Sequence, residues 1–140
     1  MRVASALNIK SQFIDTNVLL YLLSADETKA NRAEKILAAG GIVSVQVMNE
    51  FASVAFRKLH MSINDIREVL FTVRTQCKVV SLTEHTHDKG IHVMEMYKFS
   101  IYDAMIVASA LLSNCKTLMT EDMQHGQKID GVLKIQNPFY

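Results

Sequence analysis

The first clear change from a strand pattern to a helix pattern lies in Phe13-Ile14-Asp15-Thr16-Asn17-Val18-Leu19-Leu20. Residues 12–14 form a short apolar run that predicts a β-strand. Residues 17–23 begin a strongly apolar helix, which the Thr16 side chain can cap. Asp15 stands at the junction, where the strand ends and the chain turns into the helix. This stretch therefore predicts the first strand–helix unit of a domain in which strands and helices alternate.

The alternation continues along the rest of the chain. Short β-type runs predict four more strands at residues 42–45, 79–82, 117–120 and 132–136, with helical patterns between the first four strands. Asp26, Ser62 and Thr83 are expected to mark helix starts. Because helices of ten or more residues separate these strands, we expect a mostly parallel sheet that is covered on both faces. The predicted fold is an α/β three-layer α/β/α sandwich with about five strands. It forms a single domain over residues 1–140, with residues 1–11 as an N-terminal extension without an assigned role.

The composition excludes several classes of protein. The chain has 140 residues, 49% hydrophobic and 21% charged, with a net charge of +1, so intrinsic disorder is excluded. The longest apolar stretch, residues 104–112, is roughly half of the ~20 residues that cross a bilayer, so no membrane contact is expected. The nearly balanced charge leaves the attraction of nucleic acid to local basic residues or metal ions. Cys77 and Cys115 are expected to be reduced and buried, as in a cytoplasmic protein.

Four acidic residues fall where a catalytic edge would lie. Asp15 and Asp122 follow predicted strands, and ligands of parallel sheets bind beyond the carboxyl ends of the strands. Asp103 lies in the first turn of a helix that Ser100 can cap, and Glu50 lies about one turn into another helix. Taken singly, each acid has an ordinary explanation, such as a favourable contact with a helix dipole or exposure to solvent.

Taken together, the four carboxylates predict a metal site. Closely packed carboxylates repel one another and raise each other's pKa unless a cation lies between them. Mg²⁺ prefers oxygen ligands, and two-metal sites hydrolyse phosphodiesters by activating a water and stabilising the leaving oxygen. The residues alone thus indicate Mg²⁺-dependent phosphoryl chemistry.

Four segments of the chain resemble the motifs of the PIN-domain family. They are residues 13–20, Asn49-Glu50-Phe51, Tyr102-Asp103-Ala104-Met105-Ile106-Val107-Ala108 and Leu118-Met119-Thr120-Glu121-Asp122. They occur in the family's order, and the resemblance covers about residues 12–138. In size the chain is most similar to the stand-alone VapC-type toxins of bacterial toxin–antitoxin pairs.

The resemblance implies an Mg²⁺- or Mn²⁺-dependent endoribonuclease. Its metal-binding and catalytic acids would be Asp15, Glu50, Asp103 and Asp122, supported by hydrogen bonds from Thr16, Asn17 and Thr120. Glu121 departs from the family's pattern, because many relatives carry an uncharged residue there, and it could join the acids or point to solvent. The implied partners are an RNA substrate, an antitoxin whose tail lies along the early helices, and a second copy of the chain.

Three further residues are candidates for binding RNA phosphates. Arg57 lies seven residues after Glu50 on roughly the same helical face, Lys58 follows it, and His125 lies three residues after Asp122. A solvated charged face is the alternative for the two cations.

Two other functions stay open at this point. A Mg²⁺-dependent phosphatase that forms an aspartyl-phosphate commonly has a second Asp two residues after its nucleophile, and Asn17 stands at that position. A non-catalytic module that binds RNA or protein is the second alternative.

Overall fold

The computed structural model describes residues 11–140, so residues 1–10 of the predicted N-terminal extension lie outside the described residues. The described residues contain a six-stranded sheet with the strand order β3-β2-β1-β4-β6-β5. Every neighbouring pair is parallel except β5 and β6, which are antiparallel. The strands are β1 (Gln12–Ile14), β2 (Gly41–Ser44), β3 (Cys77–Val80), β4 (Thr117–Met119), β5 (Lys128–Ile129) and β6 (Leu133–Gln136).

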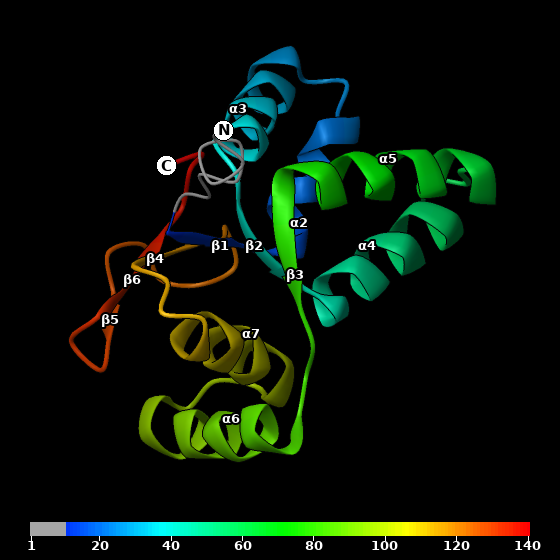
Figure 1. Cartoon of the computed structure of the whole chain (residues 1–140). Helices are drawn as coiled ribbons and strands as arrows, with labels where there is room; N and C mark the ends of the chain where they lie inside the picture. The colour runs from blue at the N-terminus through cyan, green and yellow to red at the C-terminus, as the bar shows by residue number, and fades with distance from the viewer. Residues whose placement is uncertain (1–10) are drawn as a thin grey trace, which may run out of the picture.

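Helices cover both faces of this sheet. They are α2 (Thr16–Leu20), the 3-10 helix η1 (Tyr21–Leu23), α3 (Glu27–Ala38), α4 (Val45–Arg57), α5 (Ile63–Gln76), α6 (Glu84–Tyr97) and α7 (Ile101–Leu112). Figure 1 shows α6 and α7 together on one side of the sheet and α2 to α5 on the other. The predicted three-layer α/β/α architecture with a mostly parallel sheet is therefore confirmed.

The central strand brings distant parts of the chain to one edge of the sheet. All three residues of β1 are buried, and β1 lies between β2 and β4. Ile14 is aligned with Met119, and the amide of Asp15 donates to the carbonyl of Met119 over 3.0 Å. The residues that follow β1 and β4 therefore meet at the carboxyl edge of the sheet.

Several predicted strand boundaries are wrong by one or two residues. The third strand spans Cys77–Val80 instead of residues 79–82, because parallel pairing aligns Gly41 with Cys77 and Ser44 with Val80. The second strand ends at Ser44 instead of 45, because the Ser44 side chain accepts from the amide of Val47 and caps α4. The fourth strand ends at Met119 and the last begins at Leu133, each one residue inside the prediction.

Two local features were predicted incorrectly or missed. The first helix begins at Thr16 rather than 17, and its N-cap is Asp15 instead of Thr16, because the Asp15 carboxylate accepts from the Thr16 amide. This helix ends at Leu20 and continues as η1, whereas the prediction was one helix to 23. Strand β5 was not predicted from the sequence, because it has only two residues and is held by antiparallel pairing with β6.

Other predictions agree with the structure. Asp26, Ser62 and Thr83 are the N-caps of α3, α5 and α6. Cys77 and Cys115 are both buried. None of the helices in residues 11–140 has the length and apolarity needed to cross a membrane.

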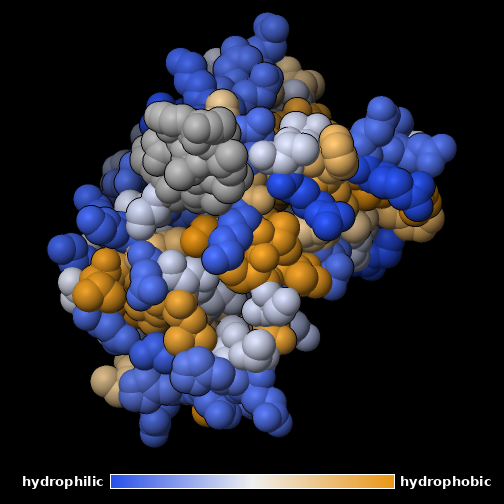
Figure 2. All heavy atoms as spheres, in the orientation of Figure 1, coloured by the Kyte–Doolittle hydropathy of each residue, from blue (hydrophilic) through white to orange (hydrophobic). Residues whose placement is uncertain are grey.

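Figure 2 shows the surface of the molecule from the side seen in Figure 1. On this face, hydrophilic residues lie at the periphery and hydrophobic residues gather near the centre.

Candidate active site

Asp15 lies at the centre of the carboxyl edge of the sheet. Its side chain is only 5% exposed. One carboxylate oxygen accepts from the Thr16 amide at 2.7 Å, and the other accepts from the Thr120 hydroxyl at 2.9 Å. Burial raises the pKa of Asp15 from 3.8 to about 6, although both hydrogen bonds oppose this increase, and the nearby charges of Glu50 and Asp122 add to it.

Asn17 connects Asp15 to the turn after β4. Its amide nitrogen Nδ2 lies 2.9 Å from Asp122 Oδ2, 3.1 Å from Thr120 Oγ1 and 3.4 Å from Asp15 Oδ2. Its Oδ1 accepts from the Glu121 amide at 3.1 Å, and the Asp122 amide donates to Thr120 Oγ1 at 3.1 Å. The predicted supporting residues Asn17 and Thr120 therefore join two acids that are more than one hundred residues apart in sequence.

Glu50 reaches the same edge from the second turn of α4. Its Oε1 lies 3.4 Å from Gln46 Nε2 and 3.5 Å from the Thr16 hydroxyl, which also lies 3.4 Å from the carbonyl of Val47. Partial burial raises the pKa of Glu50, the two side-chain hydrogen bonds lower it, and the charges of Asp103 and Asp122 raise it further. Glu50 is thus placed within the electrostatic reach of the other acids.

Asp103 approaches from the first turn of α7. Ser100 caps this helix, and its hydroxyl oxygen accepts from the Asp103 amide at 3.2 Å. Partial burial raises the pKa of Asp103, and so does the charge of Asp122. The fold therefore gathers Asp15, Glu50, Asp103 and Asp122 from four separate segments into one acidic cluster.

No cationic side chain of residues 11–140 forms an ion pair with this acidic cluster. Within residues 11–140 the one ion pair joins Lys89 to Asp130, away from the four acids. The negative charge is offset locally by amide and hydroxyl donors, which carry no net charge. A cation from solution would thus remove the repulsion between the acids, which adds to the effect of burial in raising the pKa values of Asp15, Glu50 and Asp103.

The donor set fits a hard divalent cation in its chemistry, although the side chains need to rearrange to bind one. Carboxylate oxygens are the ligands that Mg²⁺ and Mn²⁺ prefer. As the side chains stand, no three acidic, imidazole or thiol groups of the described chain are arranged to hold a metal ion. Asn17 Nδ2 donates to both Asp15 and Asp122, so an amide hydrogen occupies the space where those two carboxylates approach each other. Rotation of this amide would open that space to a cation.

Glu121 takes neither of the two positions considered from the sequence. Its Oε1 accepts a hydrogen bond from the Tyr21 hydroxyl at 2.8 Å, and this bond is the main cause of the raised pKa of Tyr21. Glu121 therefore fastens the turn after β4 to η1.

The three predicted phosphate-binding residues are not joined to the acids by any hydrogen bond or ion pair in the described chain. Arg57 is the last residue of α4 and Lys58 is its C-cap, about two turns beyond Glu50, and Arg57 Nε donates to the Ser53 hydroxyl at 3.1 Å. His125 Nδ1 accepts from the Asn137 amide at 3.0 Å, and its ring stacks on Tyr140 at 4.1 Å between centroids.

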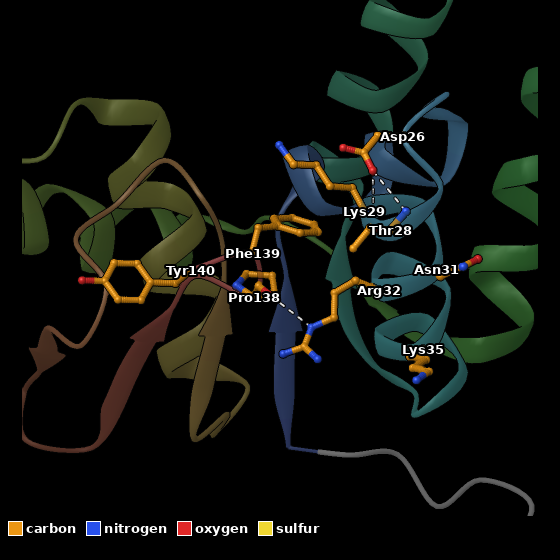
Figure 3. A pocket seen from close by; sticks show the side chains of 9 residues that line it. All are labelled: Asp26, Thr28, Lys29, Asn31, Arg32, Lys35, Pro138, Phe139 and Tyr140. Atoms are coloured by element: carbon orange, nitrogen blue, oxygen red, sulfur yellow. Dashed lines mark hydrogen bonds between the residues drawn. The ribbon is translucent and has the colours of Figure 1, made fainter.

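A basic cavity beside α3 was missed in the sequence analysis. It has a volume of about 690 Å³ and lies between α3 and the C-terminal residues (Figure 3). Lys29, Arg32 and Lys35 contribute its positive charge, and Arg32 Nε donates to the carbonyl of Pro138 at 3.0 Å. The spacing of these cations at i, i+3 and i+6 was a visible signal of one charged helix face. Tyr21 connects this cavity to the turn of the acids, since its hydroxyl contacts both Lys29 and Glu121.

Comparison with known proteins decides the family. The model of the PIN domain matches residues 13–128, which span all four acids. The chain belongs to the PIN-domain family. The chain matches none of the curated proteins with which it was compared.

Solved structures share the fold of this PIN domain at low sequence identity. A chain of a toxin–antitoxin complex from Klebsiella pneumoniae superimposes with a TM-score of 0.69 at 22% identity, over 91% of this chain and 97% of that one. The VapBC2 complex from Rickettsia felis, bound to a DNA fragment from its promoter, gives 0.63 at 16% identity, over 90% and 98%. VapC20 from Mycobacterium tuberculosis, a toxin that cleaves the sarcin–ricin loop, gives 0.61 at 16% identity, over 79% and 89%.

Proposed function

We propose that this PIN-domain protein is a metal-dependent endoribonuclease and the toxin of a toxin–antitoxin pair. The observation that carries the proposal is the acidic cluster. Asp15, Glu50 and Asp103 have raised pKa values because burial and neighbouring acids disfavour their charged forms, and no cationic side chain of residues 11–140 pairs with them. Such a cluster suits divalent cations and the phosphates that they bind.

Asp15, Glu50, Asp103 and Asp122 would hold one or two Mg²⁺ or Mn²⁺ ions. When bound, such ions activate a water and stabilise the oxygen that leaves phosphorus. The other residues of the site act by position. Thr120 and the Thr16 amide orient the Asp15 carboxylate, and Asn17 orients Asp122. The four acids therefore face the substrate from fixed elements of the sheet and the helices.

The solved relatives support the choice of substrate and partner. VapC20 is a toxin that cleaves the sarcin–ricin loop, the Klebsiella structure is a toxin–antitoxin complex, and the Rickettsia structure is VapBC2. We propose by analogy that RNA is the substrate here and that an antitoxin binds this chain. We also propose a homodimer, which the resemblance to VapC-type toxins implies. A cavity of about 360 Å³ beside Asn17 offers the antitoxin an apolar surface that includes Leu20, Leu23 and Leu59.

A cleavage assay with a matched pair of variants tests the activity. Asp103→Asn removes one acid of the cluster, whereas Asp65→Asn changes the equivalent residue of α5, which also follows a serine N-cap by three positions. We expect the wild type and Asp65→Asn to cleave ribosomal or transfer RNA when Mg²⁺ or Mn²⁺ is present. Asp103→Asn should lose at least 100-fold in cleavage rate, and induced expression should arrest growth for the first two proteins only.

Three outcomes would reject this function. Full activity of Asp103→Asn would exclude the acidic cluster as the catalytic site. Cleavage in excess EDTA would exclude a requirement for a divalent metal. A protein that binds RNA without cleaving it under any metal condition would be the non-catalytic module. Phosphate release from a phosphomonoester, with trapping of a phosphorylated Asp15, would instead indicate the phosphatase.

A further inference from the structure

A second cavity opens directly beside the acidic cluster. It has a volume of about 490 Å³, and its wall includes Glu50, Gln46 and Asn49 from α4 and Tyr102 from α7. A neighbouring cavity of about 330 Å³ shares Gln46, Leu82 and Tyr102 with it. Because Glu50 belongs to both the acidic cluster and this wall, a group in the cavity would lie next to the reacting phosphate of the proposed reaction.

The wall of this cavity combines exposed apolar surface with amide groups. The Tyr102 side chain is 70% exposed, although it lies beside Asp103 in the first turn of α7. Leu82 and Val45, each 40% exposed, supply further apolar surface. Exposed aromatic rings with few contacts of their own are the platforms on which unpaired nucleobases stack in single-stranded nucleic-acid sites.

Gln46, which lines this cavity, has a hydrogen-bond acceptor without a partner in residues 11–140. Its Nε2 lies 3.3 Å from the carbonyl of Tyr102 and 3.4 Å from Glu50 Oε1, and both of these partners are acceptors. This fixes the orientation of the amide and turns Oε1 away from both groups. The Oε1 atom is buried and has no hydrogen-bond partner in residues 11–140. A buried acceptor without a partner costs free energy, and a turn of the Gln46 side chain toward a donor, such as the amino group of a base, would recover it.

We propose that this cavity binds one unstacked base of the RNA, that of a nucleotide next to the scissile phosphate, with its ring on Tyr102 and its edge toward Gln46 and Asn49. This inference rests on the proposed function and adds to it a determinant of substrate choice. The volume lies within the ~300–1,000 Å³ of small-molecule sites. A base enters such a cavity only from a single strand or a loop, so duplex RNA should be a poor substrate.

A fluorescence titration tests the proposal, because the chain contains no tryptophan. Tyr102→Trp places the one indole of the protein in the cavity, and Phe71→Trp places one on α5 at a side chain that is similarly exposed. Both are made with Asp15→Asn so that the RNA stays intact. A ten-nucleotide single-stranded RNA of mixed sequence should quench the emission of the Tyr102→Trp protein at least twofold and leave that of the Phe71→Trp protein unchanged. An abasic oligonucleotide of equal length should bind, as its anisotropy reports, without quenching.

The outcomes separate this inference from the function on which it rests. RNA binding without quenching, or equal quenching by the abasic oligonucleotide, would overturn the base site and leave the ribonuclease proposal intact. Quenching by a co-purified protein partner and by neither oligonucleotide would assign the cavity to a protein. That outcome would also overturn the proposed base site. If the wild type neither binds nor cleaves RNA, both proposals fail.

A kinetic measurement provides an independent readout. Tyr102→Ala, which replaces an exposed ring, should raise KM for a single-stranded RNA about tenfold or move the cleavage position, while Mn²⁺ binding measured by calorimetry stays unchanged. Unchanged KM and an unchanged cleavage position would contradict a role for Tyr102 in holding a base.

Discussion

Asp15 carries a negative charge at a position that the fold almost closes to water. The fold raises its pKa from 3.8 to about 6, so the folded protein binds this proton more tightly than the unfolded chain does. Stability therefore falls as the pH rises between about 4 and 6, and it stays reduced at higher pH. The residue thus lowers the stability of the protein at neutral pH, and the proposed function gives its carboxylate the role of a metal ligand.

Asp15→Asn should consequently stabilise the protein while it removes activity. At pH 7.5 without divalent metal we expect the free energy of unfolding to rise by about 1–3 kcal/mol, because the asparagine carries no buried charge and can still cap α2. At pH 4 the difference from the wild type should nearly vanish. Urea denaturation at both pH values measures the effect, with Asp65→Asn as the control. A destabilised Asp15→Asn protein at pH 7.5 would contradict the raised pKa.

Single residues also show where prediction from sequence reaches its limit. The four acids were predicted from their places after strands and within helix turns, because local pattern determines these positions. The support from Asn17 and Thr120 was implied by the resemblance to the PIN-domain family. The contact of Glu121 with Tyr21 and the bridging role of the Asn17 amide were not predicted. Both depend on how segments about one hundred residues apart are placed in space, which local pattern does not encode.

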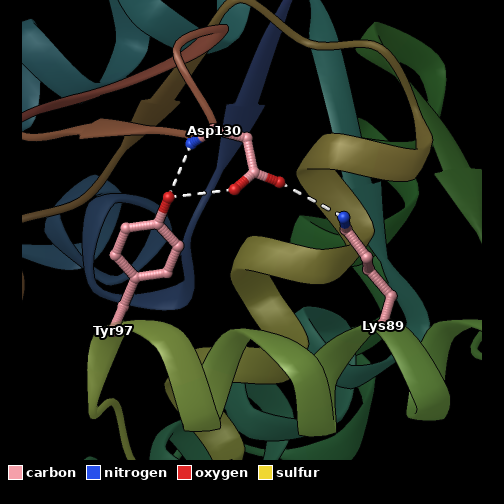
Figure 4. Close-up of polar contacts among 3 residues, drawn as sticks. All are labelled: Lys89, Tyr97 and Asp130. Carbon is pink, nitrogen blue, oxygen red and sulfur yellow. Dashed lines mark hydrogen bonds and ion pairs between the residues drawn. The ribbon is translucent and has the colours of Figure 1, made fainter.

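At the scale of elements, the short hairpin of β5 and β6 depends on contacts with α6. The Tyr97 hydroxyl accepts from the Asp130 amide at 2.8 Å and donates to Asp130 Oδ1 at 2.9 Å, while Lys89 Nζ lies 3.2 Å from Asp130 Oδ2 (Figure 4). Asp130 has a positive φ of 52°, a backbone conformation that residues other than glycine seldom adopt. This explains why the two-residue strand β5 was not predicted. Contacts with β6 and α6 stabilise it, and its own short sequence gives no strand pattern.

Tyr97→Phe should therefore loosen this hairpin. The variant leaves the Asp130 amide without its partner, and we expect a loss of about 1 kcal/mol in the free energy of unfolding at pH 7. The Tyr97 hydroxyl, followed by Lys89, lowers the pKa of Asp130. The contribution of the ionised Asp130 carboxylate to the free energy of unfolding should therefore be lost as the pH falls below about 4. Tyr140→Phe, at an 89% exposed residue whose hydroxyl has no hydrogen bond in the described chain, is the control. Hydrogen exchange should quicken in β5 and β6, and equal exchange in both variants would contradict this role.

At the scale of the whole molecule, the charge is nearly balanced but unevenly distributed. The chain has 15 Lys and Arg against 14 Asp and Glu, which excluded a global attraction for nucleic acid. The fold nevertheless collects four acids at the carboxyl edge of the sheet and aligns Lys29, Arg32 and Lys35 along α3. Tyr21 lies between the two regions, in contact with Lys29 and Glu121. An RNA backbone at the acids could therefore extend along α3, where its phosphates would meet Lys29, Arg32 and Lys35, which form no ion pair within residues 11–140.

Removing two of these cations should weaken RNA binding without disturbing the acids. Lys29→Ala combined with Lys35→Ala should lower the affinity for single-stranded RNA several-fold and reduce the slope of log K against log salt by about 1.4, as expected for the loss of two phosphate contacts. Mn²⁺ binding should be unchanged, because neither lysine contacts the acidic cluster. Lys78→Ala with Lys128→Ala, at two exposed lysines on β3 and β5, is the matched control. If both double variants show the same salt dependence as the wild type, the RNA does not follow α3, and its phosphates must be held by other cations, such as Arg57 and Lys58 at the far end of α4.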